Sequence, residues 1–130
     1  MYSAQTQSIR VTVRPEFSTE RSEPIDDAFF WLYTIEIANL GRKSVQLMQR
    51  HWRITDERGH LETVDGPGVV GEHPTIAPGK AFRYTSGCPL NTPSGFMVGS
   101  YDMVDEDGKT FEVEIPAFSL DSPFVRKVMN

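Results

Sequence analysis

The sequence predicts an all-β domain in which two antiparallel sheets pack face to face as a β-sandwich. Apolar residues alternate with polar ones along most of the chain, and this period of two is the pattern of half-buried strands. Glycine (10 residues) and proline (9 residues) gather between the alternating segments, where they indicate turns and connections. Helical spacing is confined to residues 121–128, where Pro123 suits the first position of a short terminal turn. About seven strands joined at short intervals are typical of a sandwich.

The first strand is expected at residues 9–13, where three aliphatic residues alternate with polar ones. Because proline lacks an amide hydrogen, Pro15 predicts either the end of this strand or a position at a sheet edge. The polar residues 17–27 indicate an exposed connection. Residues 29–38 give the strongest strand pattern, and one end of this segment is apolar on both faces. We therefore expect it in the middle of a sheet.

The next part of the chain predicts a hairpin that follows a turn at residues 39–43. Residues 45–55 form a strand whose apolar positions switch from odd to even numbers, which indicates a β-bulge near positions 48–49. Residues 56–59 (Asp-Glu-Arg-Gly) form the hairpin turn, and residues 60–64 form the returning strand.

The second half of the chain predicts three further strands and two irregular connections. Repeated glycines and prolines exclude regular structure from residues 65–79 and again from residues 86–95. Gly99 allows another backbone to approach closely, and residues 105–108 form a tight turn. The three strands are expected at residues 82–85, 96–104 and 110–115.

Composition indicates a single soluble domain over residues 1–130. Apolar residues make up 38% and charged residues 24%, and the net charge is −5. Because an acidic chain gains nothing from counterion release, nucleic acid and acidic membrane surfaces are not expected as partners. Cys88 is the single cysteine, which excludes an intrachain disulfide. The first residues lack the basic and apolar regions of a secretory leader, so a cytoplasmic location is expected.

The most conspicuous motif is Gly66-Pro67-Gly68-Val69-Val70-Gly71, which matches the G-x-G-x-x-G pattern of dinucleotide-binding loops. Such a loop opens a helix whose first amides hold a pyrophosphate. Here prolines follow at positions 74 and 78, and no βαβ unit is predicted anywhere in the chain. The sequence therefore excludes a dinucleotide-binding fold of that type.

Two interpretations of this loop remain. In the first, its amides form an anion-binding nest to which nearby side chains add positive charge. Asp65 and Glu72 bracket the loop with negative charge, and a divalent cation (Mg²⁺ or Co²⁺) shared with a pyrophosphate would reconcile the charges. In the second, which we prefer because the pattern alone is weakly specific, the loop only connects strands. The candidate ligand-binding residues are Gly66, Gly68, Val69, Val70, Gly71, His73, Lys80 and Arg83.

No catalytic set can be defended from the sequence, so a non-enzymatic protein without a required cofactor is expected. The nucleophile motif G-x-S-x-G does not occur, and Cys88 has no evident histidine partner, which indicates a buried or turn-lining thiol. The three histidines (His51, His60 and His73) lack metal-ligand spacing, so a histidine metal site would require the fold to gather them.

Partner binding has two candidate surfaces. Trp31 and Trp52 are expected in the core, whereas Phe30 and Leu32 lie on the opposite strand face and form a candidate apolar patch. The strand at residues 9–13 is a candidate sheet edge for pairing with another chain, including a second copy in a homodimer.

Several segments together resemble the ApaG family. The resemblance runs in order along roughly the whole chain and implies an immunoglobulin-like or fibronectin-type-III-like sandwich, in agreement with the strand pattern. It also implies a bacterial, cytoplasmic protein linked to cobalt resistance and magnesium efflux, whose relatives occur in eukaryotic F-box and other adaptor proteins. The segments are 9–13, 67–72 (PGVVGE), 78–79 (PG), 84–87 (YTSG), 95–101 (GFMVGSY) and 111–118 (FEVEIPAF).

These observations lead us to expect a non-enzymatic binding module for another protein, with an indirect link to cation efflux. The alternative is a small-ligand sensor in which residues 66–71 hold a pyrophosphate or a dinucleotide polyphosphate. A phosphohydrolase that uses Asp65 and Glu72 is a third and less supported hypothesis.

Overall fold

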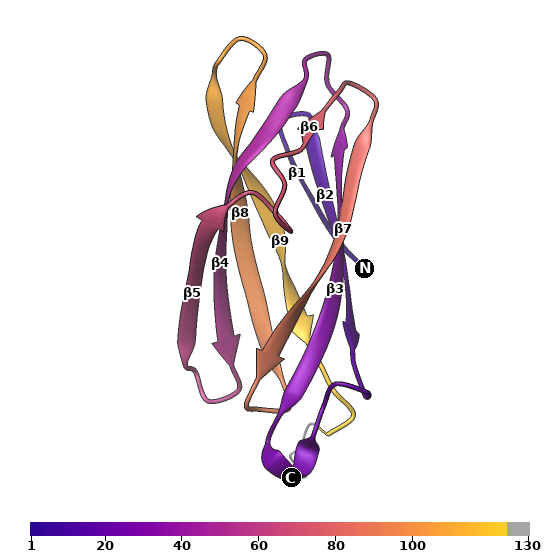
Figure 1. Cartoon of the computed structure of the whole chain (residues 1–130), viewed down its shortest axis with the longest axis vertical. Coiled ribbons are helices and arrows are strands. Elements are labelled where there is room, and N and C mark those ends of the chain that lie inside the picture. Colours follow the sequence, from indigo (N-terminus) through magenta and orange to yellow (C-terminus); the bar gives the residue numbers. More distant parts are fainter. Residues whose placement is uncertain (125–130) are drawn as a thin grey trace.

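The structure is a computed structural model that describes residues 1–124, and it shows two antiparallel sheets packed face to face (Figure 1). The predicted β-sandwich is therefore confirmed. Most of the predicted terminal helical turn, residues 125–128, lies outside the described residues. Residues 121–124 contain no helix. No helix in the described part of the chain is long and apolar enough to cross a membrane.

The first sheet has four strands in the spatial order β1-β2-β3-β7. The strand at residues 29–38 is central, as predicted, because it pairs with β2 on one side and β7 on the other. The predicted free edge at residues 9–13 is wrong, because β1 pairs with all five of those residues. The strands are β1 (Tyr2–Thr6), β2 (Ile9–Phe17), β3 (Phe29–Asn39) and β7 (Ala81–Leu90).

The second sheet has the spatial order β5-β4-β8-β9, and the two-residue strand β6 pairs with one end of β4. The predicted bulge is confirmed, because the register between β4 and β8 shifts between Leu47 and Gln49. A Cβ at Gly99 would overlap the carbonyl oxygen of His51, so the predicted close approach is also present. The strands are β4 (Val45–Asp56), β5 (Leu61–Pro67), β6 (Thr75–Ile76), β8 (Gly95–Asp105) and β9 (Thr110–Leu120).

The two predicted irregular connections are shorter than expected. β7 continues to Leu90 through Pro89, because β7 is an edge strand, where a missing amide hydrogen is tolerated. Within residues 65–79, β5 extends to Pro67 and β6 adds a short strand. β2 likewise runs through Pro15, beyond the part that β1 covers, which confirms the edge interpretation of that proline. The connection before β3 is irregular apart from one 3-10 turn, η1 (Pro24–Asp26).

The core lies between the two sheets and contains the aromatic residues that the alternation predicted. Trp31 and Trp52 are buried, at 1% and 3% exposure. Tyr33, Trp52 and Phe118 pack around one another with ring centroids 5.5 to 5.9 Å apart. Val69, from the glycine-rich loop, is also buried at 1% exposure and belongs to this core. The loop is therefore anchored between the sheets.

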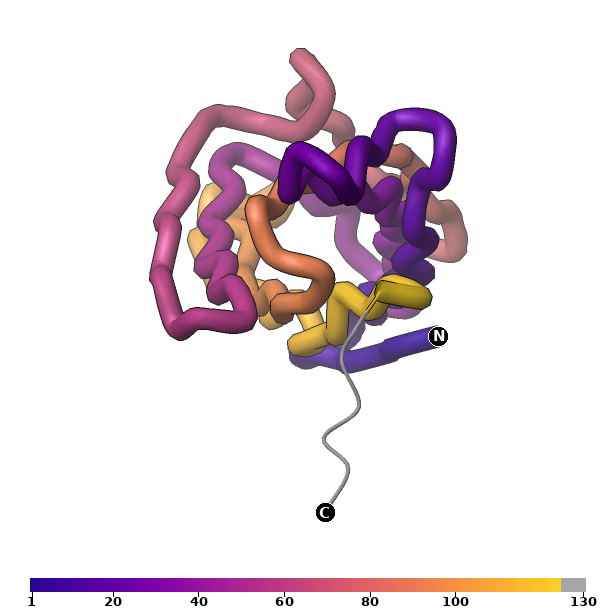
Figure 2. Tube along the Cα trace, turned by 90° about the horizontal axis from the view of Figure 1, so that it is seen from below, coloured from indigo at the N-terminus to yellow at the C-terminus, as the bar shows by residue number. Residues whose placement is uncertain are grey.

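The sandwich is closed on one side and crossed by a loop on the other. On the closed side, β9 lies against β1 and β2, and the Glu114 amide donates to the Thr6 hydroxyl oxygen at 3.0 Å. On the opposite side, the segment after β5 crosses from the β5 edge toward β7 before it reaches β6 (Figure 1). Figure 2, seen from below, shows β5 at the outer margin of the trace.

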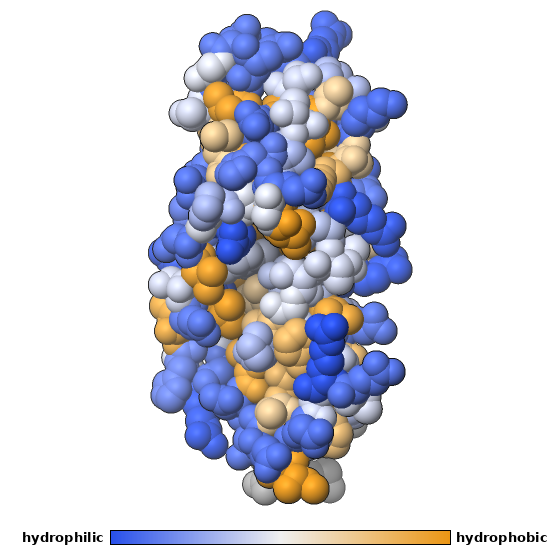
Figure 3. Space-filling view, viewed as in Figure 1, coloured by the Kyte–Doolittle hydropathy of each residue, from blue (hydrophilic) through white to orange (hydrophobic). Residues whose placement is uncertain are grey.

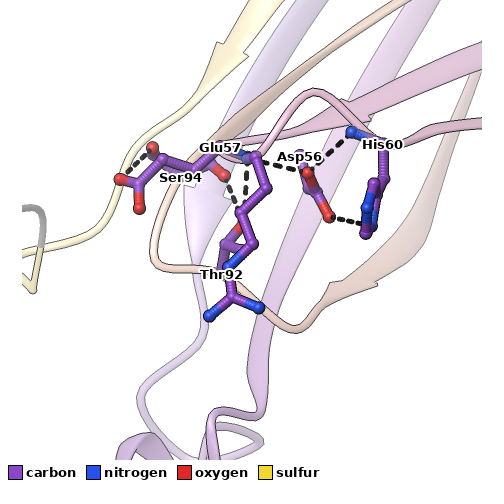
Figure 4. A network of polar contacts seen from close by, with 6 residues as sticks. Asp56, Glu57, His60, Thr92 and Ser94 are labelled. Atoms are coloured by element: carbon purple, nitrogen blue, oxygen red, sulfur yellow. Dashed lines mark hydrogen bonds and ion pairs between the residues drawn. The ribbon is translucent and has the colours of Figure 1, made fainter.

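The hairpin turn between β4 and β5 is fixed at the lower end of the molecule by polar contacts (Figure 4). The Asp56 carboxylate accepts hydrogen bonds from the amides of Arg58 and His60 at 2.8 and 3.0 Å. The Glu57 amide donates to the hydroxyl of Thr92, which is buried at 3% exposure. The bond between Glu57 and Thr92 connects the turn that precedes β5 to the connection between β7 and β8.

Candidate functional site

The glycine-rich loop contains a two-residue reverse turn that returns the chain toward the core. Val69 and Glu72 exchange two backbone hydrogen bonds at 2.9 and 2.8 Å. The residues between them, Val70 and Gly71, have φ values of 43° and 79°. Positive φ at both central positions is the geometry of a type I′ turn. Val70 is 54% exposed, so the turn presents an apolar side chain directly beside a buried one.

Each glycine of the motif has a structural reason. A Cβ at Gly66 would lie 3.0 to 3.1 Å from the guanidinium atoms of Arg50, which pairs with Gly66 across β4 and β5. Gly68 has a φ of 61°, and a Cβ there would overlap the Glu72 carbonyl oxygen. Gly71 supplies the second positive φ of the turn. The motif therefore serves the loop conformation and makes room for an arginine.

Some of the loop amides that the sequence offers for an anion already donate to carbonyl oxygens, and others have no acceptor within residues 1–124. The Gly68 amide donates to the Met48 carbonyl oxygen at 2.9 Å, and the Val69 amide is used within the turn. The amides of Val70 and Gly71 donate to no group in residues 1–124. Within residues 1–124, two of the loop's amides are therefore without an acceptor, and the loop as a whole is not an open set of donors.

The predicted cations do not all lie beside this loop. The His73 ring lies near Gly68, at 3.4 Å from the position of an added Cβ. Arg83 lines a cavity on the outer face of the first sheet together with Arg10 and Arg14. Lys80 precedes β7, where its carbonyl oxygen accepts from the Asn39 amide. Neither Lys80 nor Arg83 lines the cavity beside the turn.

The predicted cation ligand Asp65 is engaged elsewhere. Its Oδ1 atom lies 2.6 Å from Nδ1 of His51, and Nε2 of the same ring lies 2.7 Å from Oδ2 of Asp102. Hydrogen bonds to Asp102 and then to Asp65 raise the pKa of His51. Glu72 lies exposed at the end of the turn. Within the described residues, no group of three or more histidine, cysteine or carboxylate side chains is arranged so that it could hold a metal ion, and the three histidines form no such group.

The cation that does lie beside the loop is Arg50, which the sequence reasoning missed. Its Nη1 atom donates to the carbonyl oxygens of Pro67 and Gly68, both at 3.0 Å. A cavity of about 200 Å³ opens next to it, between the turn and β7. The shift of register at the bulge was the available signal, because it puts Arg50 on the same inward face as Trp52. The residues that line this cavity are Tyr33, Arg50, Trp52, Val69, Val70, Gly71, Tyr84 and Ser86.

Buried hydroxyl groups lie around this cavity. The hydroxyls of Tyr84 and Tyr101 are hydrogen-bonded to each other, and Tyr33 is buried at 5% exposure. Burial raises the pKa of all three phenols, so they are neutral donors at neutral pH. Cys88 is buried as predicted, and burial raises the pKa of its thiol to about 12. A thiol with that pKa is a poor nucleophile.

Comparison with known proteins decides the family. The family model described as "ApaG domain" matches residues 19–105, which include both the loop and Arg50. The chain belongs to the ApaG family. It is 62% identical to Protein ApaG of Methylocella silvestris and 60% identical to Protein ApaG of Beijerinckia indica, in each case over 100% of both chains.

A solved structure agrees with the ApaG fold described above. The crystal structure of a Bordetella pertussis protein described as ApaA is 44% identical to this chain and superposes with a TM-score of 0.87. The match covers 90% of this chain and 95% of that one. The family resemblance inferred from the sequence is therefore confirmed, together with the β-sandwich.

Proposed function

We propose that this ApaG chain is a non-enzymatic binding module whose partner is another protein. Any link to cobalt resistance and magnesium efflux would then act indirectly, through that partner. The observation that carries this proposal is the edge of the second sheet at β5, together with the turn beside it.

β5 has the properties of a strand that a partner can extend. Five of its seven residues are exposed, and β5 pairs with β4 on one side only. A free strand edge offers unpaired amides and carbonyls to an added strand. Leu61 at 60% exposure and Val70 at 54% exposure add apolar side chains near the two ends of this region. Figure 3, viewed as in Figure 1, shows apolar and weakly polar surface down the middle of the view, between β5 and β7, with more polar margins.

The test compares how the wild-type chain and a variant with a blocked β5 edge capture a partner. A lysine on an edge strand opposes pairing, so Thr63→Lys on β5 is expected to lose a stoichiometric partner at several salt concentrations. Ser3→Lys, an exposed position on the edge strand β1 of the other sheet, is the matched control and should retain it. Light scattering on the purified chain separates a homodimer from a different partner. Absence of any stoichiometric partner, or equal loss in both variants, would contradict the proposal.

A second candidate function is a small-ligand sensor that holds a pyrophosphate or a dinucleotide polyphosphate at residues 66–71, with or without Mg²⁺ or Co²⁺. The Arg50 guanidinium against Gly66 favours it, because an anion at the loop would meet a positive charge there. Titration calorimetry with pyrophosphate and diadenosine tetraphosphate, with and without metal, is the test. Heat that vanishes in Gly68→Asp supports the sensor, and no heat under any condition contradicts it.

A further inference from the structure

We infer that the cavity between the turn and β7 binds one compact phosphate-type oxyanion, and that Arg50 is the cation that holds it. This inference rests on the second proposed function. It names the charge and the size of ligand that the sensor would use, and it moves the site from the whole loop to a cavity that the loop borders.

The first reason is the state of the Arg50 charge. Arg50 is a half-buried residue with a positively charged guanidinium, yet no carboxylate among residues 1–124 lies within ion-pairing distance of it. Its two hydrogen bonds both come from Nη1 and go to neutral carbonyl oxygens. Since a cation without a carboxylate partner can form charge-assisted hydrogen bonds to an anion, an oxyanion beside Arg50 would be stabilised there.

The second reason is the set of donors around the cavity. The turn contributes Val70 and Gly71 to the lining, and the amides of these two residues donate to no group in the described chain. β7 contributes Ser86 to the lining, and β3 contributes Tyr33. Among residues 1–124, no carboxylate lines the cavity. Donors that approach from a loop and three strands suit a tetrahedral anion with oxygens on every side better than a planar carboxylate.

The third reason is size. The cavity volume of about 200 Å³ is below the range of about 300 to 1,000 Å³ that is usual for drug-sized ligands. It has room for six or seven water molecules at about 30 Å³ each. A cavity of this size suits phosphate or pyrophosphate better than a nucleoside. A dinucleotide polyphosphate would insert phosphate groups only, with its nucleosides outside.

The fourth reason is the backbone of the turn. Val70 is β-branched and has a φ of 43°, a conformation that is strained for such a residue. Asparagine or glycine would form the same type I′ turn without this strain. The strained turn fixes the direction of its two central amides before any ligand arrives.

The experiment is an NMR titration of the full chain with inorganic phosphate and, separately, with inorganic pyrophosphate at constant ionic strength. Amide shifts are expected at Val70, Gly71 and Ser86, together with a shift of the Arg50 side-chain Nε–H. Arg50→Gln should weaken pyrophosphate binding at least about tenfold, because a charge-assisted contact is lost. Arg83→Gln is the matched control, since Arg83 lies on the outer face of the first sheet. This variant should bind pyrophosphate with the affinity of the wild type.

Three outcomes would overturn the inference, and they separate it from the proposed functions. Equal binding in Arg50→Gln would contradict the role of Arg50 while the sensor function stands. Shifts confined to another face would contradict both the inference and a sensor at residues 66–71. No binding of either anion would contradict both the inference and the sensor, while the protein-binding function is unaffected. If Arg50→Gln does not fold, Tyr33→Phe is used instead, because it changes a single hydroxyl of a residue that lines the same cavity. Unchanged pyrophosphate affinity in Tyr33→Phe, together with wild-type shifts away from the cavity, would then contradict the inference.

Discussion

Asn39 offers the sharpest test of how this sandwich is held together. Its side chain is 1% exposed at the end of β3. Nδ2 donates to the carbonyl oxygens of Lys43 and Ile76 at 2.8 and 2.9 Å, and Oδ1 accepts from the Gly41 amide at 3.0 Å. Asn39→Ala removes all three hydrogen bonds. At about 1 kcal/mol each, with a further cost for buried groups left without partners, we expect a loss of about 3–5 kcal/mol.

That loss is a large part of the roughly 5–15 kcal/mol by which a domain of this size is stable. Urea unfolding followed by circular dichroism measures it, with the slope m as a check on the denatured state. Asn91→Ala makes the same chemical change at an exposed position and should alter the free energy of unfolding by less than about 0.5 kcal/mol. An Asn39→Ala variant within 1 kcal/mol of the wild type, at unchanged m, would refute the reasoning.

Three further predictions concern other parts of the sandwich. Because the folded-state pKa of His51 is raised above 6.5, its two carboxylate contacts stabilise the fold below the unfolded pKa, and this contribution is lost as pH rises through the folded pKa. Urea midpoints from pH 5 to 9 should show this decline, and a His51→Gln variant should lack it. Gly99→Ala should cost about 2–3 kcal/mol in chemical denaturation, because the new methyl group meets a backbone carbonyl, whereas Gly108→Ala has open space and costs only its positive φ, about 1 kcal/mol. Val70→Asn should stabilise the fold by about 1 kcal/mol, measured as a higher melting temperature, and a decrease would show that the turn is not strained.

The fold could be predicted because alternation and turn residues act locally, and most strands of this chain carry both. The strand at Tyr2–Thr6 was missed because its residues are largely polar and its pairing with β2 is long-range information. The extension of β7 to Leu90 was missed for a different reason. The ring of Phe30 packs against Gly87 and occupies the space that a side chain there would need. Pro89 lies on a sheet edge. Both are tertiary facts that override local preference.

The site was only partly predictable, because sequence proximity is a poor guide to spatial proximity in a sandwich. Arg83 was included for its closeness in sequence to the loop, but its neighbour Tyr84 faces the core, so alternation places Arg83 on the outer face. Arg50 lies sixteen positions before Gly66 in the chain and directly opposite it across the sheet. Combining the predicted bulge with the predicted hairpin register would have found this pair.

The insertion of Val69 into the core has a consequence for local opening. Val69 is 1% exposed and Val70, one peptide bond away, is 54% exposed. Surface loops usually open independently of the domain, but this one cannot release Val69 without disturbing the packing between the sheets. In hydrogen exchange, the Val69 amide should be released only by global unfolding, whereas the Val70 amide should exchange freely. The loop therefore belongs to the same cooperative unit as the strands on either side of it.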